Sequence, residues 1–440
     1  MSAASELGAH LAPSSTPQGA GEAVQPRLGE IALLIQGDDN YGVGQVARET
    51  VALLPGIRCV AFCDGTEAED IRRLGTPVHL LPGGVYFRGF VPGAGAVRAL
   101  RQILQARHHW VRCAHELHTW CERQGVRVLH GNVWAHYFTL SALRRAHPGR
   151  YRVIWHTHNF LNLDRHFGLR GRFNLWQVRR GADWLLCVSH AVAAGWGRSG
   201  VPTRVVHNSV PSRLAGLPEA APFSQRRRPD VLRLVGAGRM EWSKGHHVTI
   251  EAVARLRNSG VPATLDLFGG PVSGNAYCDE LRSQIHRLGL DPFVALRGYA
   301  NDLPQRLPDY DIAVQARIDP EPCALYILEC LFQGMPLAAS SGGGTPELLR
   351  DGREGRLYTP GDSGSLAEAV AWLAENPART DFLSGAARRR CLSEFSPARF
   401  ARKLSDFYAE IQGNCEAGAG RAGEGGRVRD LRAAAKGSST

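Results

Sequence analysis

The chain has 440 residues, of which 44% are hydrophobic and 21% are charged. This composition is typical of a globular protein and excludes a disordered chain, and no apolar run reaches the roughly 20 residues that span a bilayer. The formal net charge of +11 favours an anionic partner, but the charge alone leaves nucleic acid, acidic lipid and a phosphorylated small molecule open. A length of 440 residues predicts two domains, each with its own core.

Residues 1–28 are rich in Ala, Gly, Ser and Pro and lack the basic start and apolar block of a signal peptide, so we expect a disordered leader. The ten cysteines are far apart, and the closest pair, Cys59 and Cys63, has no matching second pair. This spacing disfavours a zinc site or a disulfide framework. We therefore expect reduced, mostly buried cysteines in a cytoplasmic protein.

The first half of the chain alternates short apolar runs with helical stretches. Residues 30–36 predict a buried strand, which a glycine loop with Gly42 and Gly44 joins to a helix that starts near Gln45. Such a loop either presents backbone amides to an anion or is a plain tight turn, and the residues alone favour neither. Four more strands are predicted at residues 57–62, 126–130, 152–156 and 184–189.

Strands that alternate with helices predict a parallel sheet covered by helices on both faces. Ligands of such sheets gather at the carboxyl ends of the strands. His130, His158 and Ser189 lie at or just past predicted strand ends. We therefore regard them as candidate functional residues.

A long helix is predicted at residues 96–124. It combines four arginines with an apolar face: Arg98, Arg101, Arg107 and Arg112 beside Val97, Leu100, Leu104, Val111 and Leu117. The pattern suits either contact with an anionic membrane surface or packing on the sheet with a solvated basic face. We favour the packed helix, and peripheral membrane contact stays an alternative.

Residues 211–230 lose periodicity and collect Pro and Arg, which predicts a linker. A second series follows, with strands predicted at residues 232–236, 263–269, 294–298, 312–315 and 336–339 and helices between most of them. We therefore expect an α/β protein with two Rossmann-like domains that face each other across a cleft. The predicted segments are a disordered leader, an N-terminal domain, a linker, a C-terminal domain, a final helix that returns to the N-terminal domain, and a disordered tail: residues 1–28, 29–210, 211–230, 231–396, 397–412 and 413–440.

Arg239 and Lys244 lie five positions apart in a loop between a predicted strand and the helix that begins near His247. A planar guanidinium and a mobile ammonium at one strand end can converge on one anion, and the pair suits a diphosphate. The alternative is a solvated basic turn.

Glu321 and Glu329 form a second motif. Pro322 fits the first turn of a helix, so we expect Glu321 just before the helix and Glu329 about two turns inside it. That spacing is too long for a hydrolase pair and suits an extended ligand, because carboxylates accept strong hydrogen bonds from hydroxyls. The alternative is a helix-dipole partner and a surface charge, although the neighbours of Glu329 are apolar.

Residues 340–347 predict a third strand, glycine loop and helix start, with Thr345 as the N-cap and Pro346 as the first helical residue. We expect the amides of this loop to be free for an anion or a hydroxyl. Three such loops in one domain favour a nucleotide-bearing ligand.

The order of these motifs resembles the donor half of the retaining glycosyltransferases of family 4, which have the GT-B fold and an E-x7-E motif. The resemblance implies that Arg239 and Lys244 bind the donor diphosphate in place of a metal. It also implies that Glu321 lies by the donor sugar as a catalytic residue and that Glu329 binds the ribose. The donor would be a nucleoside-diphosphate sugar used as co-substrate, and neither a cofactor nor a metal is implied.

The glycine-rich turn resembles the family loop that holds the sugar and phosphates, which assigns Gly343, Gly344 and Thr345 to donor binding. His158 resembles the family histidine near the donor sugar, with His156 as a rival. The loop with Gly42 and Gly44 looks like the one that approaches the donor phosphates or the acceptor.

The resemblance extends over residues 30–412 and is strongest over residues 232–360. It makes the N-terminal domain the acceptor-binding one and the C-terminal domain the donor-binding one. Two positions depart from the family: Cys323 and Ala324 follow Pro322 where Phe-Gly is usual, and Ser209 follows an asparagine that Gly usually follows. The sugar pocket is therefore open to change.

The resulting hypothesis is a metal-independent retaining glycosyltransferase that acts on a glycan, lipid-linked or small-molecule acceptor, with nucleic acid not expected as a partner. Two alternatives remain: a non-catalytic protein that binds a nucleotide sugar or nucleic acid, and a nucleotide-sugar epimerase of the same fold. The residues do not indicate the sugar, the base, the acceptor or the linkage.

Overall fold

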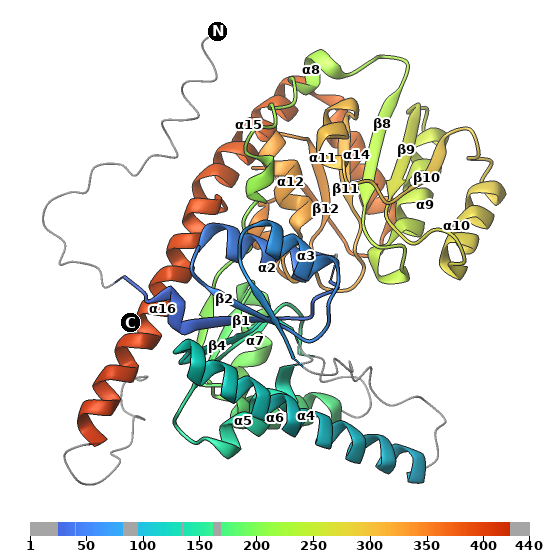
Figure 1. Ribbon diagram of the computed structural model, residues 1–440. Helices are drawn as coiled ribbons and strands as arrows, with labels where there is room; N and C mark the ends of the chain where they lie inside the picture. Colours follow the sequence, from blue (N-terminus) through green and yellow to red (C-terminus); the bar gives the residue numbers. More distant parts are fainter. Residues whose placement is uncertain (1–24, 40, 82–95, 134–135, 162–168, 423–440) are drawn as a thin grey trace, which may run out of the picture. The chain divides into compact units, whose positions relative to one another are not determined.

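The computed structural model describes residues 25–39, 41–81, 96–133, 136–161 and 169–422 (Figure 1). By their contacts these residues belong to two units. Residues 28–403 form one unit, which contains both β-sheets, and residues up to Arg27 with those from Leu404 onward form the other.

Within the described residues, the N-terminal sheet has seven parallel strands in the spatial order β3-β2-β1-β4-β5-β6-β7. Its strands are β1 (Ile31–Ile35), β2 (Arg58–Ala61), β3 (Val78–Leu80), β4 (Val128–Gly131), β5 (Arg152–Thr157), β6 (Trp184–Cys187) and β7 (Thr203–Val205). All five residues of β1 are buried, as expected for a central strand that is covered on both faces.

The strand order reverses between β1 and β4, so the loops that follow these two strands meet at the carboxyl edge of the sheet. The helices of this domain are α2 (Gly42–Leu53), α3 (Thr66–Arg73), α4 (Ala96–Gln124), α5 (Tyr137–Ala146), α6 (Leu169–Gly181) and α7 (His190–Trp196), with short 3-10 turns η1 (Leu28–Glu30), η4 (Gly197–Ser199) and η5 (Ser212–Leu214).

The C-terminal sheet has six parallel strands among the described residues, in the order β10-β9-β8-β11-β12-β13. Its strands are β8 (Leu232–Ala237), β9 (Ala263–Phe268), β10 (Val294–Gly298), β11 (Ile312–Gln315), β12 (Leu337–Ser340) and β13 (Arg356–Tyr358). The order reverses between β8 and β11, which brings the loops after these strands together.

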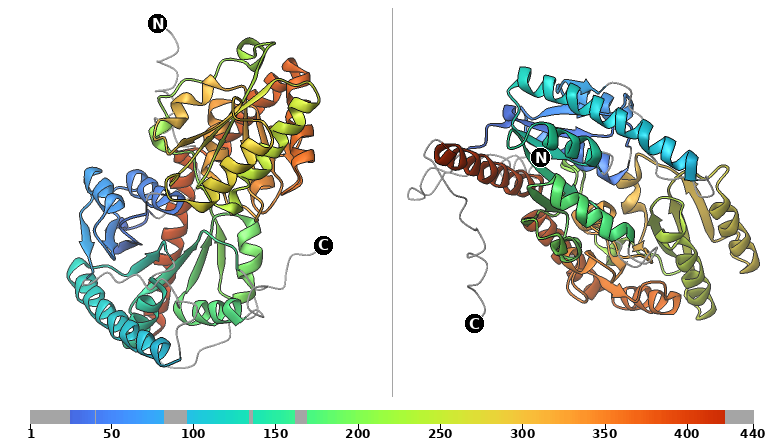
Figure 2. Two further views of the ribbon diagram at one scale, coloured as in Figure 1. Left: turned by 90° about the vertical axis from the view of Figure 1, so that its right-hand side faces the viewer. Right: turned by 90° about the horizontal axis from the view of Figure 1, so that it is seen from below.

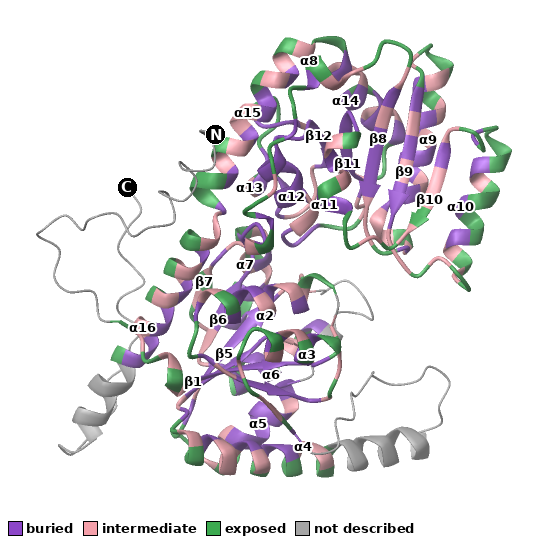
Figure 3. Ribbon diagram, turned by 45° about the horizontal axis from the view of Figure 1, so that its top comes forward, coloured by how far each residue is buried: buried purple, intermediate pink, exposed green. Residues whose placement is uncertain are grey.

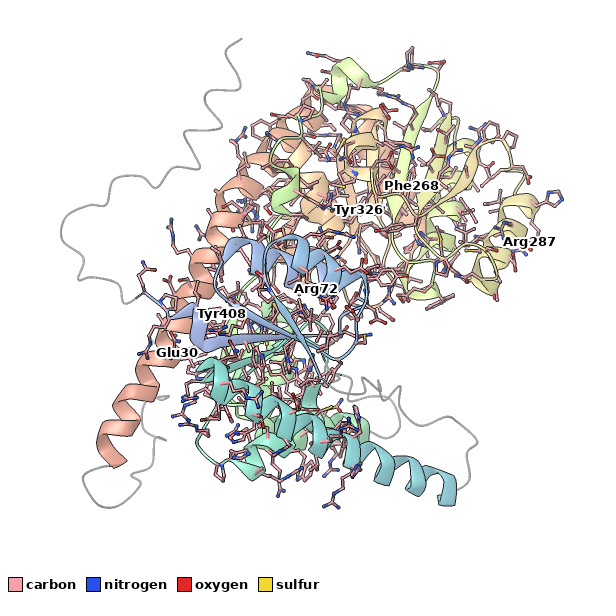
Figure 4. The ribbon with its side chains drawn as sticks, in the orientation of Figure 1. Glu30, Arg72, Phe268, Arg287, Tyr326 and Tyr408 are labelled. Atoms are coloured by element: carbon pink, nitrogen blue, oxygen red, sulfur yellow. The ribbon has the colours of Figure 1, made fainter. Side chains whose placement is uncertain are left out.

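The helices of the C-terminal domain cover this sheet, and α9 and α10 contact each other (Figure 2). They are α8 (Phe223–Arg226), α9 (His246–Asn258), α10 (Ala276–Arg287), α11 (Leu303–Arg306), α12 (Leu325–Gln333), α13 (Thr345–Leu348), α14 (Ser363–Glu375) and α15 (Pro377–Glu394), with 3-10 turns η6 (Trp242–Lys244) and η7 (Leu307–Asp309). Figure 3 shows the central strands of both sheets in the colour of buried residues. Inside this domain the Tyr326 hydroxyl, labelled in Figure 4, donates a hydrogen bond to the carbonyl of Val235 at 3.1 Å and so ties α12 to β8.

The predicted pair of parallel-sheet, Rossmann-like domains is confirmed, but several element bounds were wrong. Helix α2 begins at Gly42 rather than near Gln45, and α12 begins at Leu325 rather than Pro322. Helix α13 takes Gly344 as its N-cap, so Thr345 is its first residue. The short strands β3, β7 and β13 were not predicted, since each has only three residues.

The long predicted helix is present as α4, which packs on α5. Its buried side includes Cys113, Leu117 and Cys121, all 0% exposed. Val111 was predicted to lie on this apolar face, but it is 52% exposed, so that part of the prediction was wrong. The side chains of residues 96–106 lie outside the described ones. No described helix combines the length and the apolar character that crossing a bilayer requires.

Helix α16 (Pro397–Ala422) extends ten residues beyond the predicted end at residue 412, so residues 413–422 are helical rather than irregular. In the smaller unit, Oε1 of Gln412 accepts a hydrogen bond from the backbone amide of Arg27 at 2.9 Å, and Nε2 of Gln412 donates to the carbonyl of Arg27 at 3.0 Å. Residues 1–24 and 423–440, most of the predicted leader and tail, lie outside the described residues. The predicted domain boundaries, and the return of the final helix to the N-terminal domain, stay predictions.

Candidate active site

Lys244, Arg317 and Glu321 form a buried ionic cluster at the carboxyl edge of the C-terminal sheet. The Lys244 ammonium lies 3.6 Å from Oε2 of Glu321, and the Arg317 guanidinium donates to the same oxygen at 3.3 Å. The side-chain amide nitrogen of Gln315, the last residue of β11, lies 3.5 Å from that oxygen. Glu321 is 7% exposed, so two cations balance a carboxylate that has little contact with water.

Gly245 makes this cluster possible. Its φ of +68° is favourable only for glycine, and a Cβ at this position would lie 1.8 Å from the carbonyl oxygen of Ala316. The loop after β8 therefore packs directly on the end of β11, which brings Lys244 to Glu321. Burial lowers the pKa of the Lys244 amine, and the negative charge of Glu321 opposes that shift.

Arg239 lies in the same loop, close enough to Lys244 that its positive charge also lowers the pKa of the Lys244 amine. Its guanidinium is 3.0 Å from Oε1 of Glu241 and 5.4 Å from the ring centre of Tyr41 in the N-terminal domain. Arg239, Gly42 and Glu329 line a cleft of about 920 Å³ to which both domains contribute. Lys244 and Glu321 are not among the described residues that line this cleft.

Glu329 lies inside α12, where its side chain is 11% exposed. Oε1 is 3.3 Å from the guanidinium of Arg213, a residue of the predicted linker. Burial raises the pKa of Glu329 to about 7, and the charge of Arg213 lowers it in part. Its protonation state therefore changes near neutral pH.

The glycine-rich loop after β12 is hydrogen-bonded to Glu321. Glu321 and Gly343 form a parallel bridge, in which the amide of Gly344 donates to the carbonyl of Glu321 at 2.7 Å. Gly343 has a φ of +69°, and a Cβ there would lie 2.4 Å from that carbonyl. The prediction that the loop amides are free is thus wrong for Gly344. Thr345 is 0% exposed in the first turn of α13.

Glu347, two residues further along, connects α13 to the N-terminal domain. Its two carboxylate oxygens accept bonds from the amides of His190 and Ala191, both at 2.8 Å, at the start of α7. His207 Nε2 lies 2.7 Å from Oε2. Burial raises the pKa of Glu347, but the hydrogen bonds from His207 and the two amides outweigh it and hold this pKa below its ordinary value.

Ser189 has a structural role in the same contact. Its side chain is 0% exposed and caps α7 by accepting a bond from the amide of Val192 at 3.2 Å. A Cβ on Gly344 would lie 2.9 Å from the Ser189 side chain, so the loop and the start of α7 are in close contact.

His158 follows β5 and is half-buried. Its Nε2 lies 2.9 Å from Oδ1 of Asn132, and its ring centre lies 4.0 Å from that of His156. Burial lowers the pKa of His158 to about 3, so the ring is neutral at physiological pH. His156 and His130 are almost fully buried, at 2% and 0% exposed, which makes His158 the accessible histidine of the three.

The loop of Gly42 and Gly44 enters α2 directly. A Cβ on Gly44 would lie 2.0 Å from the carbonyl of Asp39, so the tight return of the chain requires glycine there. The carboxylate of Glu67 accepts a bond from the amide of Gly37 at 2.7 Å and holds the start of this loop. Gly42 faces α12, since its added Cβ would lie 3.8 Å from Leu325.

The two domains also meet where Asn208 donates to the carbonyl of Cys323 at 3.0 Å. This bond and the bridge to Gly343 hold residues 321–324 outside the helix, with Pro322 in a bend. They explain why α12 begins at Leu325 and not at Pro322.

The comparisons with known proteins concern the same half of the chain. Residues 232–376 match the family model described as Glycosyl transferases group 1. The chain is 33% identical over 189 residues to a glycogen synthase of Mycobacterium tuberculosis, a match that covers 42% of this chain and 45% of that protein. It is 30% identical over 243 residues to the lipopolysaccharide core biosynthesis glycosyltransferase LpsE of Rhizobium meliloti, covering 53% and 64% of the two chains. The matches thus span roughly half the length of these curated relatives.

Solved structures extend the likeness to both domains. Anabaena Alr3699/HepE in complex with UDP and glucose has a TM-score of 0.69 at 20% identity, and the match covers 87% of this chain and 99% of that one. Sucrose-phosphate synthase from Thermosynechococcus elongatus also has a TM-score of 0.69, at 18% identity, with 87% and 99% covered. The chain has the GT-B fold.

The GT-B fold brings the predicted site residues into three groups: Lys244 with Glu321 and the glycine loop, Arg239 with Glu329 and Gly42 along the cleft, and His158 beside Asn132. The sequence did not point to a further set of residues that contact the predicted ones: Asn132, Arg213, Gln315, Arg317 and the carboxylate of Glu347. Of these, Arg317 had a usable signal, because it lies just past a predicted strand end four residues before Glu321.

Proposed function

We propose that the chain is a retaining glycosyltransferase of family 4. It would transfer a sugar from a nucleoside-diphosphate sugar to a hydroxyl of a glycan, lipid-linked or small-molecule acceptor, without a metal. The proposal is supported by the group 1 match over residues 232–376, by the GT-B fold, and by the glycosyltransferase names of the relatives. The UDP and glucose bound by Alr3699/HepE support a nucleotide-sugar donor.

The observation that carries the proposal is the ionic cluster of Lys244, Arg317 and Glu321. Glu321 belongs to the E-x7-E spacing, and Lys244 belongs to the loop that we expect to bind the diphosphate. Their charged atoms are 3.6 Å apart at one strand edge. A donor whose diphosphate reaches Lys244 therefore has its sugar next to the Glu321 carboxylate.

The chemistry follows from this placement. As the bond between the sugar C1 and the diphosphate oxygen breaks, negative charge grows on the diphosphate, and Lys244 and Arg239 stabilise it electrostatically. The acceptor oxygen forms the new bond to C1 on the face that the diphosphate leaves. Its proton passes to the departing phosphate oxygen. No side chain has to become a covalent nucleophile, and Glu321 stabilises the positive charge on the sugar.

Glu329 would bind the ribose, the role that the resemblance implies, and its position in the cleft with Arg239 supports this role. An ionised carboxylate accepts bonds from vicinal hydroxyls, and the raised pKa of Glu329 makes this contact sensitive to pH. The acceptor would lie on the N-terminal side of the cleft, near Gly42. Acceptors of polysaccharide biosynthesis are consistent with the names of the relatives.

The test is a screen of UDP-, GDP- and ADP-sugars that records nucleotide release with and without EDTA, repeated with Glu321→Ala and Arg239→Ala. We expect release that is insensitive to EDTA and falls at least a hundredfold in both variants, the loss typical of one removed transition-state contact. Proton NMR of the product then gives the anomeric configuration. Turnover that both variants retain would contradict the site assignment.

A further inference from the structure

Asn132 links three strand ends of the N-terminal sheet. It directly follows β4 and is 1% exposed, and its backbone amide donates to the carbonyl of Leu34 in β1 at 3.1 Å. Its Nδ2 donates to the carbonyl of Val43 in α2 at 3.2 Å. Its Oδ1 lies 2.9 Å from Nε2 of His158, after β5.

These contacts fix which way the Asn132 amide faces. The carbonyl of Val43 can only accept a hydrogen bond, so the atom that faces it must be the amide nitrogen. The oxygen of Asn132 therefore faces His158, and it can only accept. A contact of 2.9 Å then requires a proton on Nε2 of His158.

The surroundings of His158 disfavour a second proton on the ring. Among the described residues, two further imidazoles lie beside it: His156, whose ring centre is 4.0 Å away, and His130 beyond it, at 5.2 Å from His156. Neither is a carboxylate that would stabilise an imidazolium, and the pKa of His158 is lowered to about 3 by burial. A neutral imidazole with a proton on one nitrogen has a bare lone pair on the other.

We infer that Asn132 is a positioning residue that holds His158 as the neutral Nε2–H tautomer, so that Nδ1 meets the substrate only as a hydrogen-bond acceptor. The group that it recognises is therefore a hydroxyl, from the donor sugar or the acceptor, and not a phosphate oxygen, which has no proton to donate at neutral pH. This substrate assignment rests on the proposed function, but the tautomer does not.

Two contacts place this arrangement beside the donor loops. Phe160, two residues after His158, packs against the Gly343 loop: a Cβ added to Gly343 would lie 3.0 Å from the Phe160 ring. Val43 is in the first turn of α2 next to Gly42, which faces Leu325 of α12. Asn132 thus connects His158 to the loop of Gly42, which lines the cleft.

The direct test is NMR of the full chain labelled with ¹⁵N and ¹³C at histidine, with the His158 ring signals assigned by their loss in His158→Gln. At pH 7 we expect the ring nitrogen and Cδ2 shifts of a neutral Nε2–H imidazole. Shifts of the Nδ1–H tautomer or of an imidazolium would overturn the inference. The spectrum requires no turnover, so a failed donor screen would contradict the proposed function and leave the tautomer result standing.

Two variants give the functional readout. Asn132→Leu removes the acceptor, and we expect a mixture of tautomers and a kcat about tenfold lower, the value of one hydrogen bond in the transition state, with KM changed less than threefold. Asn132→Asp keeps an acceptor for Nε2–H and adds a negative charge, so the Nε2–H tautomer should persist and the imidazolium should appear nearer neutral pH.

Asn376→Leu is the control, because the side chain of this asparagine, the N-cap of α15, accepts a hydrogen bond from the amide of Arg379 at 3.0 Å and lies outside the candidate site. It should lower the melting temperature and leave both kcat and the His158 spectrum unchanged. If Asn132→Leu does not fold, Asn132→Asp decides by the pH at which the His158 imidazolium appears, which should move toward neutral pH. A tautomer and a kcat unchanged in Asn132→Leu, or a His158 titration unchanged in Asn132→Asp, would overturn the positioning role.

Discussion

Replacing Glu347 with alanine removes a carboxylate that holds the start of α7 against the loop of Gly343 and Gly344. Two backbone amides donate to it at 2.8 Å, and each such contact at a helix start contributes about 1 kcal/mol. The His207 side chain, whose Nε2 lies 2.7 Å from Oε2 of the same carboxylate, adds up to about 1 kcal/mol as one further hydrogen bond. The total loss is about 2–3 kcal/mol.

For a unit of this size, about 2 °C in melting temperature corresponds to 1 kcal/mol, so we expect Glu347→Ala to melt about 4–6 °C lower at pH 7. Glu347→Gln can still accept one amide bond and should lose about half as much. The control is Glu375→Ala, whose side chain is 76% exposed and 3.9 Å from Arg379, and which should change the melting temperature by less than 1 °C.

The pH dependence has a defined sign. The pKa of Glu347 is lower in the folded protein than its ordinary value of 4.5. Its stabilising effect is therefore complete above about pH 4.5 and disappears as the pH falls through the folded value. The melting temperatures of the wild type and Glu347→Ala should converge in acid, measured by differential scanning fluorimetry. A constant difference, or none at pH 7, would refute this account of the contact.

Four further predictions concern the cleft and its loops. Because burial raises the pKa of Glu329 to about 7, affinity for a UDP-sugar should fall up to tenfold from pH 8 to pH 6 by calorimetry, and Glu329→Gln should abolish that dependence. Arg213→Ala removes the charge that lowers this pKa, so the affinity loss should begin at a higher pH, and an unchanged profile would contradict the pairing. Gly245→Ala should destabilise the protein by at least about 3 kcal/mol. Gly352 has a similar φ of +66°, but a Cβ there would have no atom within 4 Å, so Gly352→Ala should cost only about 1 kcal/mol. Equal losses for the two variants in chemical denaturation would exclude the close approach of Gly245 to Ala316. Lys244→Met and Glu321→Gln should be non-additive in kcat/KM by about 1–3 kcal/mol in a double-mutant cycle, and additivity would place the two groups out of contact.

The fold could be predicted from the sequence where local pattern decides it. The buried runs at Ile31–Ile35 and Ile312–Gln315 are strands in the structure, because a strand covered on both faces must be apolar throughout. The prediction failed at residues 321–324. Pro322 suits a helix start, but the bridge to Gly343 and the bond from Asn208 keep this segment outside the helix, and neither contact is visible in the local sequence.

In the candidate site, too, the sequence pointed to residues in local motifs and missed residues that are joined only by long-range contacts. The spacing of Arg239, Lys244, Glu321 and Glu329 along the chain predicts that they bind one ligand, and this stays a prediction. The partners of Glu347 were missed because His207 is 140 residues away in the sequence, and Asn132 is 26 residues from His158. Contacts of this kind depend on how strands from distant parts of the chain are ordered in the sheet.

The most direct test of the central proposal is UDP release from UDP-glucose in the presence of EDTA, measured for the wild type, Glu321→Ala and Glu375→Ala. The proposed mechanism predicts metal-independent release by the wild type and the Glu375 control and a loss of at least a hundredfold in Glu321→Ala. Equal release by all three proteins would contradict the assignment of Glu321 to the reacting sugar. Should UDP-glucose not be a substrate, the same comparison applies to the UDP-, GDP- or ADP-sugar that the donor screen selects.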